Sequence, residues 1–407
     1  MGKYIHLFQT KEEFNQAVEN NFTKPWVSYT KENDKVDYYK TEYERKCKQY
    51  FTIEATEDGT TVYFRQSGYA DSEGFGPLKV EVSTDDGETW TEVTAALAED
   101  DVPGATLAEL DERDKVLIRG TNDTYGYYSS EEYNDDTVDN CNFYADKPCY
   151  VYGNIMSLVG GDDFARLRKV KEYAFTYFFS DYDGDLDWSW VLSKEGEELL
   201  LPATTLAIDC YKHMFTDCIG LAVAPKLPAT ILANSCYCGM FDGCTGLTSA
   251  PELPATTLAE FCYYYMFRDC TGLTTAPELP ATTLSEGCYE AMFQDCTSLT
   301  TAPELPATTL ASTCYGYMFK GCTSLTTAPE LPATTLADRC YECMFYNCTN
   351  LSYIKAMFTT TPGNSYTSSW VKSVKATGTF VKNSAAAWNV TGIHGIPSGW
   401  TVETAGN

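Results

Sequence analysis

Cysteine has the most regular spacing of any residue in this 407-residue sequence and the widest range of possible chemistry. Six cysteines recur every 26 residues, and a second set of six follows each of them by eight. The sets are Cys210, Cys236, Cys262, Cys288, Cys314 and Cys340, and Cys218, Cys244, Cys270, Cys296, Cys322 and Cys348. Regularly spaced thiols could form disulfides, hold zinc or fill a core.

The expected geometry favours packing over cross-linking or metal binding. Two positions eight apart on a helix are separated by about 12 Å, and equivalent positions on stacked helices by about 8–10 Å. Both distances exceed the roughly 7 Å that a disulfide allows between Cα atoms. The extra Cys238 and Cys343 create no paired zinc motif. We therefore predict rows of small buried thiols, with no metal or cofactor. Cys141 and Cys149 could pair across a turn, although an intracellular origin favours thiols.

Catalytic motifs give no support for an enzyme. The three histidines, His6, His213 and His394, lie in unrelated segments, and neither a Gly-x-Ser-x-Gly motif nor a Walker loop occurs. Residues 83–90 match the Asp-box pattern Ser-x-Asp-x-Gly-x-x-Trp. Asp-boxes occur in several copies in sialidases, together with an arginine cluster, so one copy predicts only a hairpin with Trp90 packed behind the turn. A glycan-processing enzyme is thus the least favoured hypothesis, and no catalytic residue is assigned.

Two acidic loops carry aromatic side chains that could contact a ligand. One spans residues 121–140 and the other is an insertion at residues 183–198. Aromatic rings beside carboxylates can bind glycans, and the acids alone can bind calcium. The alternative, which the composition favours, is a solvated loop whose aromatics cap the first repeat unit. The candidate residues are Tyr125, Tyr127, Tyr128, Tyr133, Trp188 and Trp190.

Overall composition excludes several classes of function. A formal charge of −28 leaves no broad basic surface for nucleic acid and would be repelled by anionic membranes. No apolar run reaches the roughly 18 residues of a membrane span, and the N-terminal residues lack the hydrophobic run of a signal peptide. We therefore expect synthesis and retention in a cytoplasm without membrane insertion. The length and the 44% hydrophobic content predict two to four packed domains.

The 26-residue repeat predicts the architecture that positions these residues. Each copy has the frame Leu-Pro-Ala-Thr-Thr-Leu-Ala, then Cys-Tyr, Met-Phe, Cys-Thr, Leu-Thr and Ala-Pro-Glu. Apolar residues from Cys262 to Leu273 are spaced as on one face of a two-turn helix, and residues 273–276 form a short strand ended by Pro277. One unit cannot fold alone, so stacked units should form a solenoid. Residues 172–182 are an irregular first copy, giving seven units, and residues 351–358 begin an eighth without the helix.

The copies differ most at two positions after Cys-Tyr, which we place on the outward helix face. Tyr264, Tyr265 and Tyr317 are aromatic there, whereas other copies carry Lys-His, Cys-Gly or Glu-Ala. Drift at exposed positions explains this variation without function, and a surface that contacts a partner is the alternative. These three tyrosines complete the set of candidate binding residues.

The first 160 residues contain shorter patterns. Residues 3–45 combine a strand, a capping box at residues 10–13 that opens a helix, and a hairpin. From residue 50 to residue 160, β-rich runs alternate with turns, which predicts an antiparallel sandwich. The predicted strands are 50–53, 61–65, 78–82, 115–119 and 150–153.

Two segments resemble known families. The Leu-Pro-Leu frame followed by Met-Phe, Cys and Leu resembles the BspA-type leucine-rich repeat over about residues 172–358, although these units are longer than usual. That resemblance implies a surface adhesin or protein-binding module without catalytic residues. Residues 3–45 resemble the N-terminal region of virion proteins from tailed phages of gut bacteria. That resemblance implies a module that attaches the chain to the particle.

Together these patterns predict an α+β multidomain protein. Residues 1–48 form the attachment module, 49–160 a β-sandwich, 161–358 the solenoid and 359–407 a β-rich cap. The expected function is that of a non-enzymatic phage structural protein, a fibre or capsid decoration, which contacts a protein or glycan on the host surface. Expected partners are other virion proteins and the host receptor, with a homotrimer as one possible assembly and the virion as location. The alternative is a bacterial BspA-like adhesin, which would require export.

Overall fold

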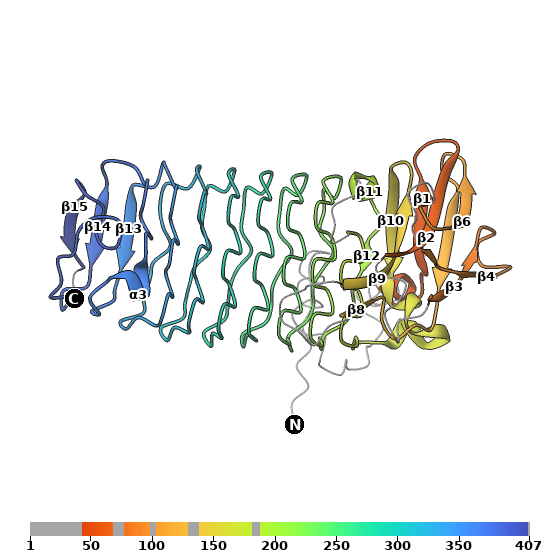
Figure 1. The fold of residues 1–407 in the computed structure, drawn as a ribbon, viewed down its shortest axis with the longest axis horizontal. Coiled ribbons are helices and arrows are strands. Elements are labelled where there is room, and N and C mark those ends of the chain that lie inside the picture. Colours follow the sequence, from red (N-terminus) through yellow and green to blue (C-terminus); the bar gives the residue numbers. More distant parts are fainter. Residues whose placement is uncertain (1–42, 68–76, 98–102, 129–137, 181–187, 406–407) are drawn as a thin grey trace, which may run out of the picture.

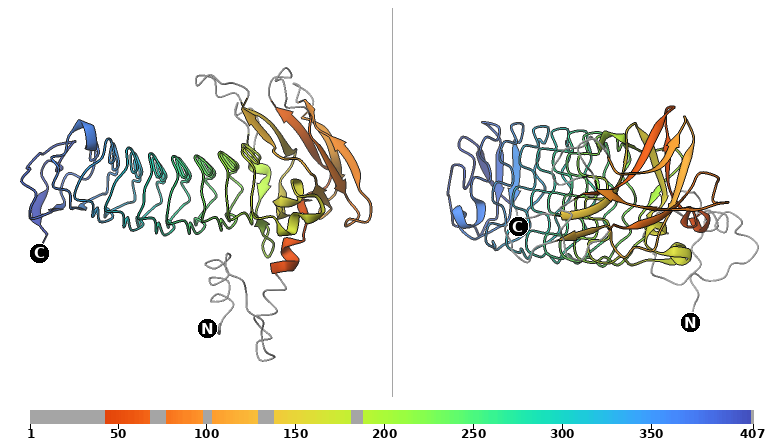
Figure 2. Two further views of the ribbon diagram at one scale, coloured as in Figure 1. Left: turned by 90° about the horizontal axis from the view of Figure 1, so that it is seen from below. Right: turned by 45° about the vertical axis from the view of Figure 1, so that its right-hand side comes forward.

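The computed structural model describes residues 43–67, 77–97, 103–128, 138–180 and 188–405. These residues form an elongated molecule with two β-sheets at one end, a row of stacked coils in the middle and a small parallel sheet at the other end (Figure 1). Two further views show the coils following one another in line between these ends (Figure 2). Most of the predicted N-terminal module lies outside the described residues, apart from a helical segment at residues 43–47.

The front end contains a larger and a smaller sheet. The larger sheet has the order β11-β10-β1-β7-β3-β4, with β12 also beside β10, and the smaller has the order β5-β2-β9-β8, with β6 beside β2. All five predicted strands are confirmed, as β1, β2, β3, β7 and β10. The larger sheet comprises β1 (Phe51–Ala55), β3 (Lys79–Ser83), β4 (Thr91–Thr94), β7 (Lys115–Arg119), β10 (Cys149–Asn154), β11 (Val191–Leu192) and β12 (Leu199–Leu200). The smaller comprises β2 (Thr60–Ser67), β5 (Ala96–Leu97), β6 (Ala105–Leu110), β8 (Gly126–Tyr128) and β9 (Val138–Ala145).

Aromatic side chains join the two sheets. Phe51 on β1 stacks on Phe143 of β9, with ring centroids 5.7 Å apart, and Phe64 on β2 lies 5.0 Å from Phe143. All three rings are buried. The sheets are mixed rather than purely antiparallel, because β11 and β12 pair in parallel with β10 and β5 pairs in parallel with β2. The prediction of an antiparallel sandwich is corrected to this extent.

The insertion ties the sheets to the coils. Its strand β11 follows the 3-10 helix η3 (Trp188–Trp190) and extends the larger sheet, so one hydrophobic core runs from the sheets into the coils. Lys194 reaches back to the buried Glu54 on β1, at 2.5 Å, and Glu54 also accepts a hydrogen bond from Tyr152. Two more 3-10 helices, η1 (Ile155–Leu158) and η2 (Gly161–Arg166), complete the junction.

The predicted two-turn helices of the repeats are wrong. Each segment is instead a run of tight turns in which every fourth residue has a positive φ, as at Ser235 (54°), Gly239 (58°) and Gly243 (71°). Between these points, alternate N–H groups bond within the coil and to the next coil. Met240 donates to the Tyr237 carbonyl three residues back, whereas Gly239 donates to the Tyr264 carbonyl of the following coil at 2.7 Å. Half of the backbone hydrogen bonds of each turn segment are therefore made with the neighbouring coil, and an isolated unit could not form them.

The turn geometry places side chains inside the stack with a period of four. Within one coil Cys236, Tyr237, Met240, Phe241 and Cys244 are all buried. Equivalent tyrosines of successive coils stack with centroids 5.7–6.1 Å apart, and equivalent phenylalanines do so at 5.3–5.9 Å. The predicted strands at the other edge are reduced to single parallel bridges, such as Thr275 with Ser249 and with Thr301.

The eighth unit, which the sequence suggested begins at residue 351 without the segment predicted as a helix, contains that segment as a further coil. Phe345 donates to the Trp370 carbonyl, and Ser369 and Ser373 have positive φ, so residues 365–373 repeat the turn ladder. Short helix α3 (Asn364–Thr367) begins this segment. The β-rich tail is confirmed, since it supplies β14 and β15 to a parallel sheet of order β13-β14-β15, in which β13 belongs to the eighth unit. Its strands are β13 (Tyr353–Ala356), β14 (Thr379–Lys382) and β15 (Thr401–Thr404). Trp370, fully buried, ends the aromatic columns.

Candidate binding site

Three of the predicted loop aromatics, Tyr125, Trp188 and Trp190, are buried and do not form a binding surface. Tyr125 is fully buried among Phe64, Phe143 and Phe175, and its hydroxyl donates to the Leu158 carbonyl. Trp188 and Trp190 are also buried, 3% exposed each, against Tyr144 and Phe179. Ligand contact by these three rings is therefore wrong, whereas the favoured alternative, in which the aromatics cap the first repeat unit, is confirmed, because the rings seal the junction between the sheets and the first coil. Tyr127 and Tyr128 lie on β8, where the structure describes only the backbone, and Tyr133 lies outside the described residues.

The Asp-box forms the predicted hairpin. Asp85 accepts hydrogen bonds from the Thr89 amide (2.9 Å) and hydroxyl (2.6 Å), while Trp90 donates to the Gly87 carbonyl. Hydrogen bonds from Thr89 and Ser83 lower the pKa of Asp85 to about 2. Arg119 lies over the Trp90 ring, 4.1 Å from its centroid. Each group is thus engaged in closing the turn between β3 and β4.

The cysteine ladder is a core element, as predicted. All 17 cysteines are thiols, and all twelve of the ladder are buried. Cys141 and Cys149 are not joined by a disulfide. The second row has a specific contact, since the Cys270 thiol donates to the Phe241 carbonyl at 3.0 Å and Cys244 does the same to Phe215. Burial raises the pKa of these thiols, which keeps them protonated. Within the described residues no cluster of His, Cys, Asp and Glu could hold a metal ion.

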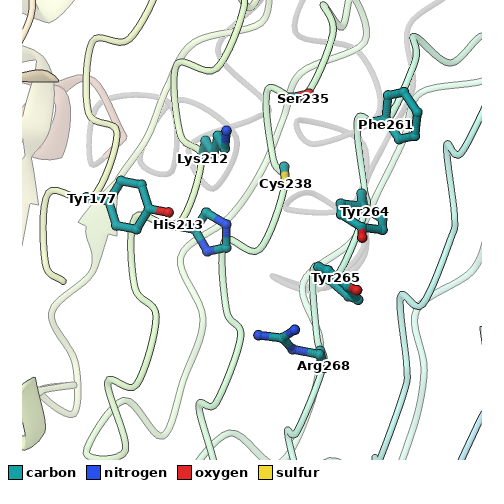
Figure 3. A pocket seen from close by; sticks show the side chains of 9 residues that line it. All are labelled: Tyr177, Lys212, His213, Ser235, Cys238, Phe261, Tyr264, Tyr265 and Arg268. Atoms are coloured by element: carbon teal, nitrogen blue, oxygen red, sulfur yellow. The ribbon is translucent and has the colours of Figure 1, made fainter. Parts of the chain in front are cut away.

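The outward face of the first coils carries a pocket of about 350 Å³ (Figure 3). Two of the three predicted outward tyrosines, Tyr264 and Tyr265, line it, whereas Tyr317 lies two coils further along and is not part of the lining. The other lining residues come from four consecutive coils: Tyr177, Lys212, His213, Ser235, Cys238, Phe261 and Arg268.

The pocket exists because the third coil has small side chains where its neighbours have rings. Gly239 occupies the position held by Tyr177, His213 and Tyr265 in adjacent coils. The His213 ring leans over this glycine, and a Cβ added there would lie 2.2 Å from the ring. Cys238 similarly replaces the Tyr264 of the next coil. These two small residues leave a hollow between His213 and the Tyr264–Tyr265 pair (Figure 3).

One wall of the pocket is a stacked pair of rings. Tyr177 and His213 are parallel, with centroids 4.8 Å apart. His213 Nδ1 lies 3.0 Å from the Thr216 hydroxyl, which itself donates to the Gly239 carbonyl. Because the hydroxyl proton is used in that bond, Nδ1 carries the imidazole proton and Nε2 is left as an acceptor. Burial, with smaller contributions from Lys212 and Arg268, lowers the pKa of His213 to about 3, so the ring is neutral at physiological pH.

The opposite wall combines aromatic and cationic groups. Tyr264 and Tyr265 have ring centroids 3.8 Å apart, and the Arg268 guanidinium lies 4.3 Å from the Tyr265 centroid. Arg268 donates from Nε (2.8 Å) and from Nη2 to the two carboxylate oxygens of Asp242, a nearly buried acid. This bidentate ion pair fixes the orientation of the Arg268 guanidinium plane. Because the guanidinium lies over the Tyr265 ring, the ion pair also restricts the position of that ring.

The lining offers several groups that could contact a ligand. The site contains a cysteine and a histidine, but burial raises the pKa of Cys238 to about 12, so its thiol remains protonated and a poor nucleophile. What remains are ring faces, hydroxyls, one imidazole acceptor and two cations. Sequence reasoning found Tyr264 and Tyr265 but missed Lys212, His213 and Arg268. The Cys-Gly pair at residues 238–239, next to aromatic equivalents in the neighbouring copies, was the signal for the hollow.

Comparison of the chain with protein-family models, with curated proteins and with solved structures found no match. No helix among the described residues is long and apolar enough to cross a membrane.

Proposed function

We propose that this chain is a non-enzymatic attachment protein of a tailed-phage virion, which presents a BspA-like leucine-rich-repeat solenoid to a host-surface receptor. The observation that carries the proposal is the pocket between His213 and Tyr265, because it concentrates rings and polar groups on an outward face. Ligand pockets typically combine apolar or aromatic walls with a few placed polar groups. The protonated Cys238 thiol supports binding over catalysis.

The architecture supports the same proposal. Inter-coil hydrogen bonds and continuous aromatic columns make the stack an extended scaffold, which fixes the coils that line the pocket relative to one another. The sequence resemblance of residues 3–45 to phage virion modules supplies the virion part of the proposal. In this account the N-terminal module contacts other virion proteins, and the coils contact a protein or glycan of the host.

Two measurements test this function. Mass spectrometry of purified phage particles should detect the chain at a stoichiometric level, and fluorescently labelled full chain should bind cells of the host strain. Absence from particles would remove the virion assignment. Detection in the outer surface fraction of a bacterium that carries no phage would favour the alternative, a BspA-like bacterial adhesin. Lack of binding to any cell tested would contradict the attachment function itself.

A further inference from the structure

The pocket is a gap in a column of aromatic side chains. Tyr177, His213, Tyr265 and Tyr317 occupy the same position in their coils, and the column is interrupted by Gly239 between His213 and Tyr265 and by Ala291 between Tyr265 and Tyr317. Coils are separated by about the distance between β-strands, so the two flanking positions are roughly 10 Å apart. The His213 ring leans into the space beside Gly239, where an added Cβ would lie 2.2 Å from it. The hollow is the remaining space between this ring and the Tyr264–Tyr265 pair, and its walls are aromatic.

The size and polarity of the hollow match a single sugar. A volume of about 350 Å³ lies at the lower end of the roughly 300–1,000 Å³ of ligand pockets. Pyranose rings present C–H groups on their faces, which pack on aromatic rings, and hydroxyls on their edges. His213 Nε2 can accept from one such hydroxyl, and the Ser235 hydroxyl lies in the same lining. A purely apolar ligand would leave these polar groups without partners.

The charge of the lining selects the type of sugar. Lys212 and Arg268 are the charged residues of the lining, and both are cationic; Arg268 is also paired with Asp242, which lies outside the lining. Arg268 uses Nε and Nη2 for Asp242, and its Nη1 carries two further N–H donors. Both cations contribute to the lowered pKa of His213, so their potential extends to the ring. Charge complementarity favours a carboxylate at this site.

We propose that the pocket binds a pyranose that carries a carboxylate, as in a hexuronic acid unit of an acidic surface polysaccharide. The ring lies between His213 and Tyr265, and the carboxylate faces Lys212 and Arg268. This inference rests on the proposed attachment function and names its ligand class.

Isothermal titration of the full chain with galacturonic acid and with galactose tests the proposal. The acid should bind at least tenfold more tightly than the neutral sugar. Lys212→Gln should weaken binding of the acid by about tenfold, since one charge-assisted contact contributes on the order of 1.4 kcal/mol, and should leave galactose binding unchanged. Tyr265→Ala should remove binding of both sugars.

The matched control is Tyr317→Ala. Tyr317 has the same positive φ and a cation over its ring, Lys320 at 5.7 Å, but lies outside the pocket. Ala291 occupies the same coil position naturally, so alanine is compatible with this backbone. Equal binding of the two sugars, binding of neither, or equal loss in the two alanine variants would overturn the proposal. Binding to host cells distinguishes failure of the sugar ligand from failure of the attachment function. If Tyr265→Ala binds host cells as well as wild type does, only the assignment of the sugar fails. If the wild-type chain binds galacturonic acid but not host cells, only the attachment function fails.

Discussion

The buried tyrosine column leads to a stability prediction of unusual sign. Tyr211, Tyr263 and Tyr315 are almost fully buried, and their hydroxyls have no hydrogen-bond partner among the residues that the structure describes. Leaving a buried donor unpaired costs about 1–3 kcal/mol. Phenylalanine removes the hydroxyl and keeps the ring stack, and Phe175 already occupies the equivalent position in the first coil, 5.8 Å from Tyr211. We therefore expect Tyr263→Phe to raise the free energy of unfolding by about 1–3 kcal/mol.

Thermal unfolding followed by circular dichroism measures this change. For a cooperative unit of 150–250 residues, each kcal/mol shifts Tm by roughly 2–4 °C. The matched control is Tyr152→Phe, where the buried hydroxyl donates to Glu54 at 2.7 Å. That variant should lose about 1.5–3 kcal/mol, because a hydrogen bond to a charged acceptor is removed. A lower Tm for Tyr263→Phe would refute the reasoning, since it would show that the hydroxyl makes a stabilising contact.

Three further predictions concern the ladder, the junction and the pocket. Cys270→Ala should lower the free energy of unfolding of the stack by about 1–2 kcal/mol, since it removes the thiol contact to the Phe241 carbonyl and leaves a small void. Urea denaturation measures this change, and an unchanged midpoint would contradict the prediction. Trp188→Ala should lower the free energy of unfolding by about 3–5 kcal/mol, because the ring is buried at the junction between the sheets and the first coil. Limited proteolysis should then cleave the variant near residue 188. Resistance equal to that of the wild type would show that the ring is dispensable. His213 has a folded pKa lowered to about 3 by burial, below its ordinary 6.5, so its neutral form is the one that folding favours. The stability it contributes is present above pH 6.5 and is lost as pH falls toward 3, and His213→Tyr, which copies Tyr265, should show a shallower loss of Tm over that range; identical pH profiles would contradict the assignment.

The repeat sequence predicted the interior of the stack but not its backbone. Cys262, Met266 and Phe267 were correctly expected on one buried face. The helix prediction failed because periods of 3.6 and 4 differ little over nine residues. The adjacent pairs Cys-Tyr and Met-Phe, four residues apart, fit the period of four better. The positive φ angles could not be predicted either, because Phe261 and Tyr265 adopt them although neither is glycine. Hydrogen bonds to the next coil hold this conformation, and no single unit contains them.

The candidate site was only partly predictable for a related reason. Outward variation marked Tyr264 and Tyr265, but the pocket also requires residues up to 91 positions apart, from Tyr177 to Arg268, brought together by stacking. For Tyr125, Trp188 and Trp190 the sequence left ligand contact open beside the favoured capping role, because local composition does not reveal burial. Trp188 and Trp190 follow a run of aspartates, yet both rings turn inward against Tyr144 and Phe179.

The most direct test of the binding site is an experimental structure of the full chain with galacturonic acid. The account predicts density for one sugar ring between His213 and Tyr265, with its carboxylate directed at Lys212 and Arg268. At a concentration that saturates binding in solution, an empty pocket, or a sugar bound elsewhere on the chain, would contradict it.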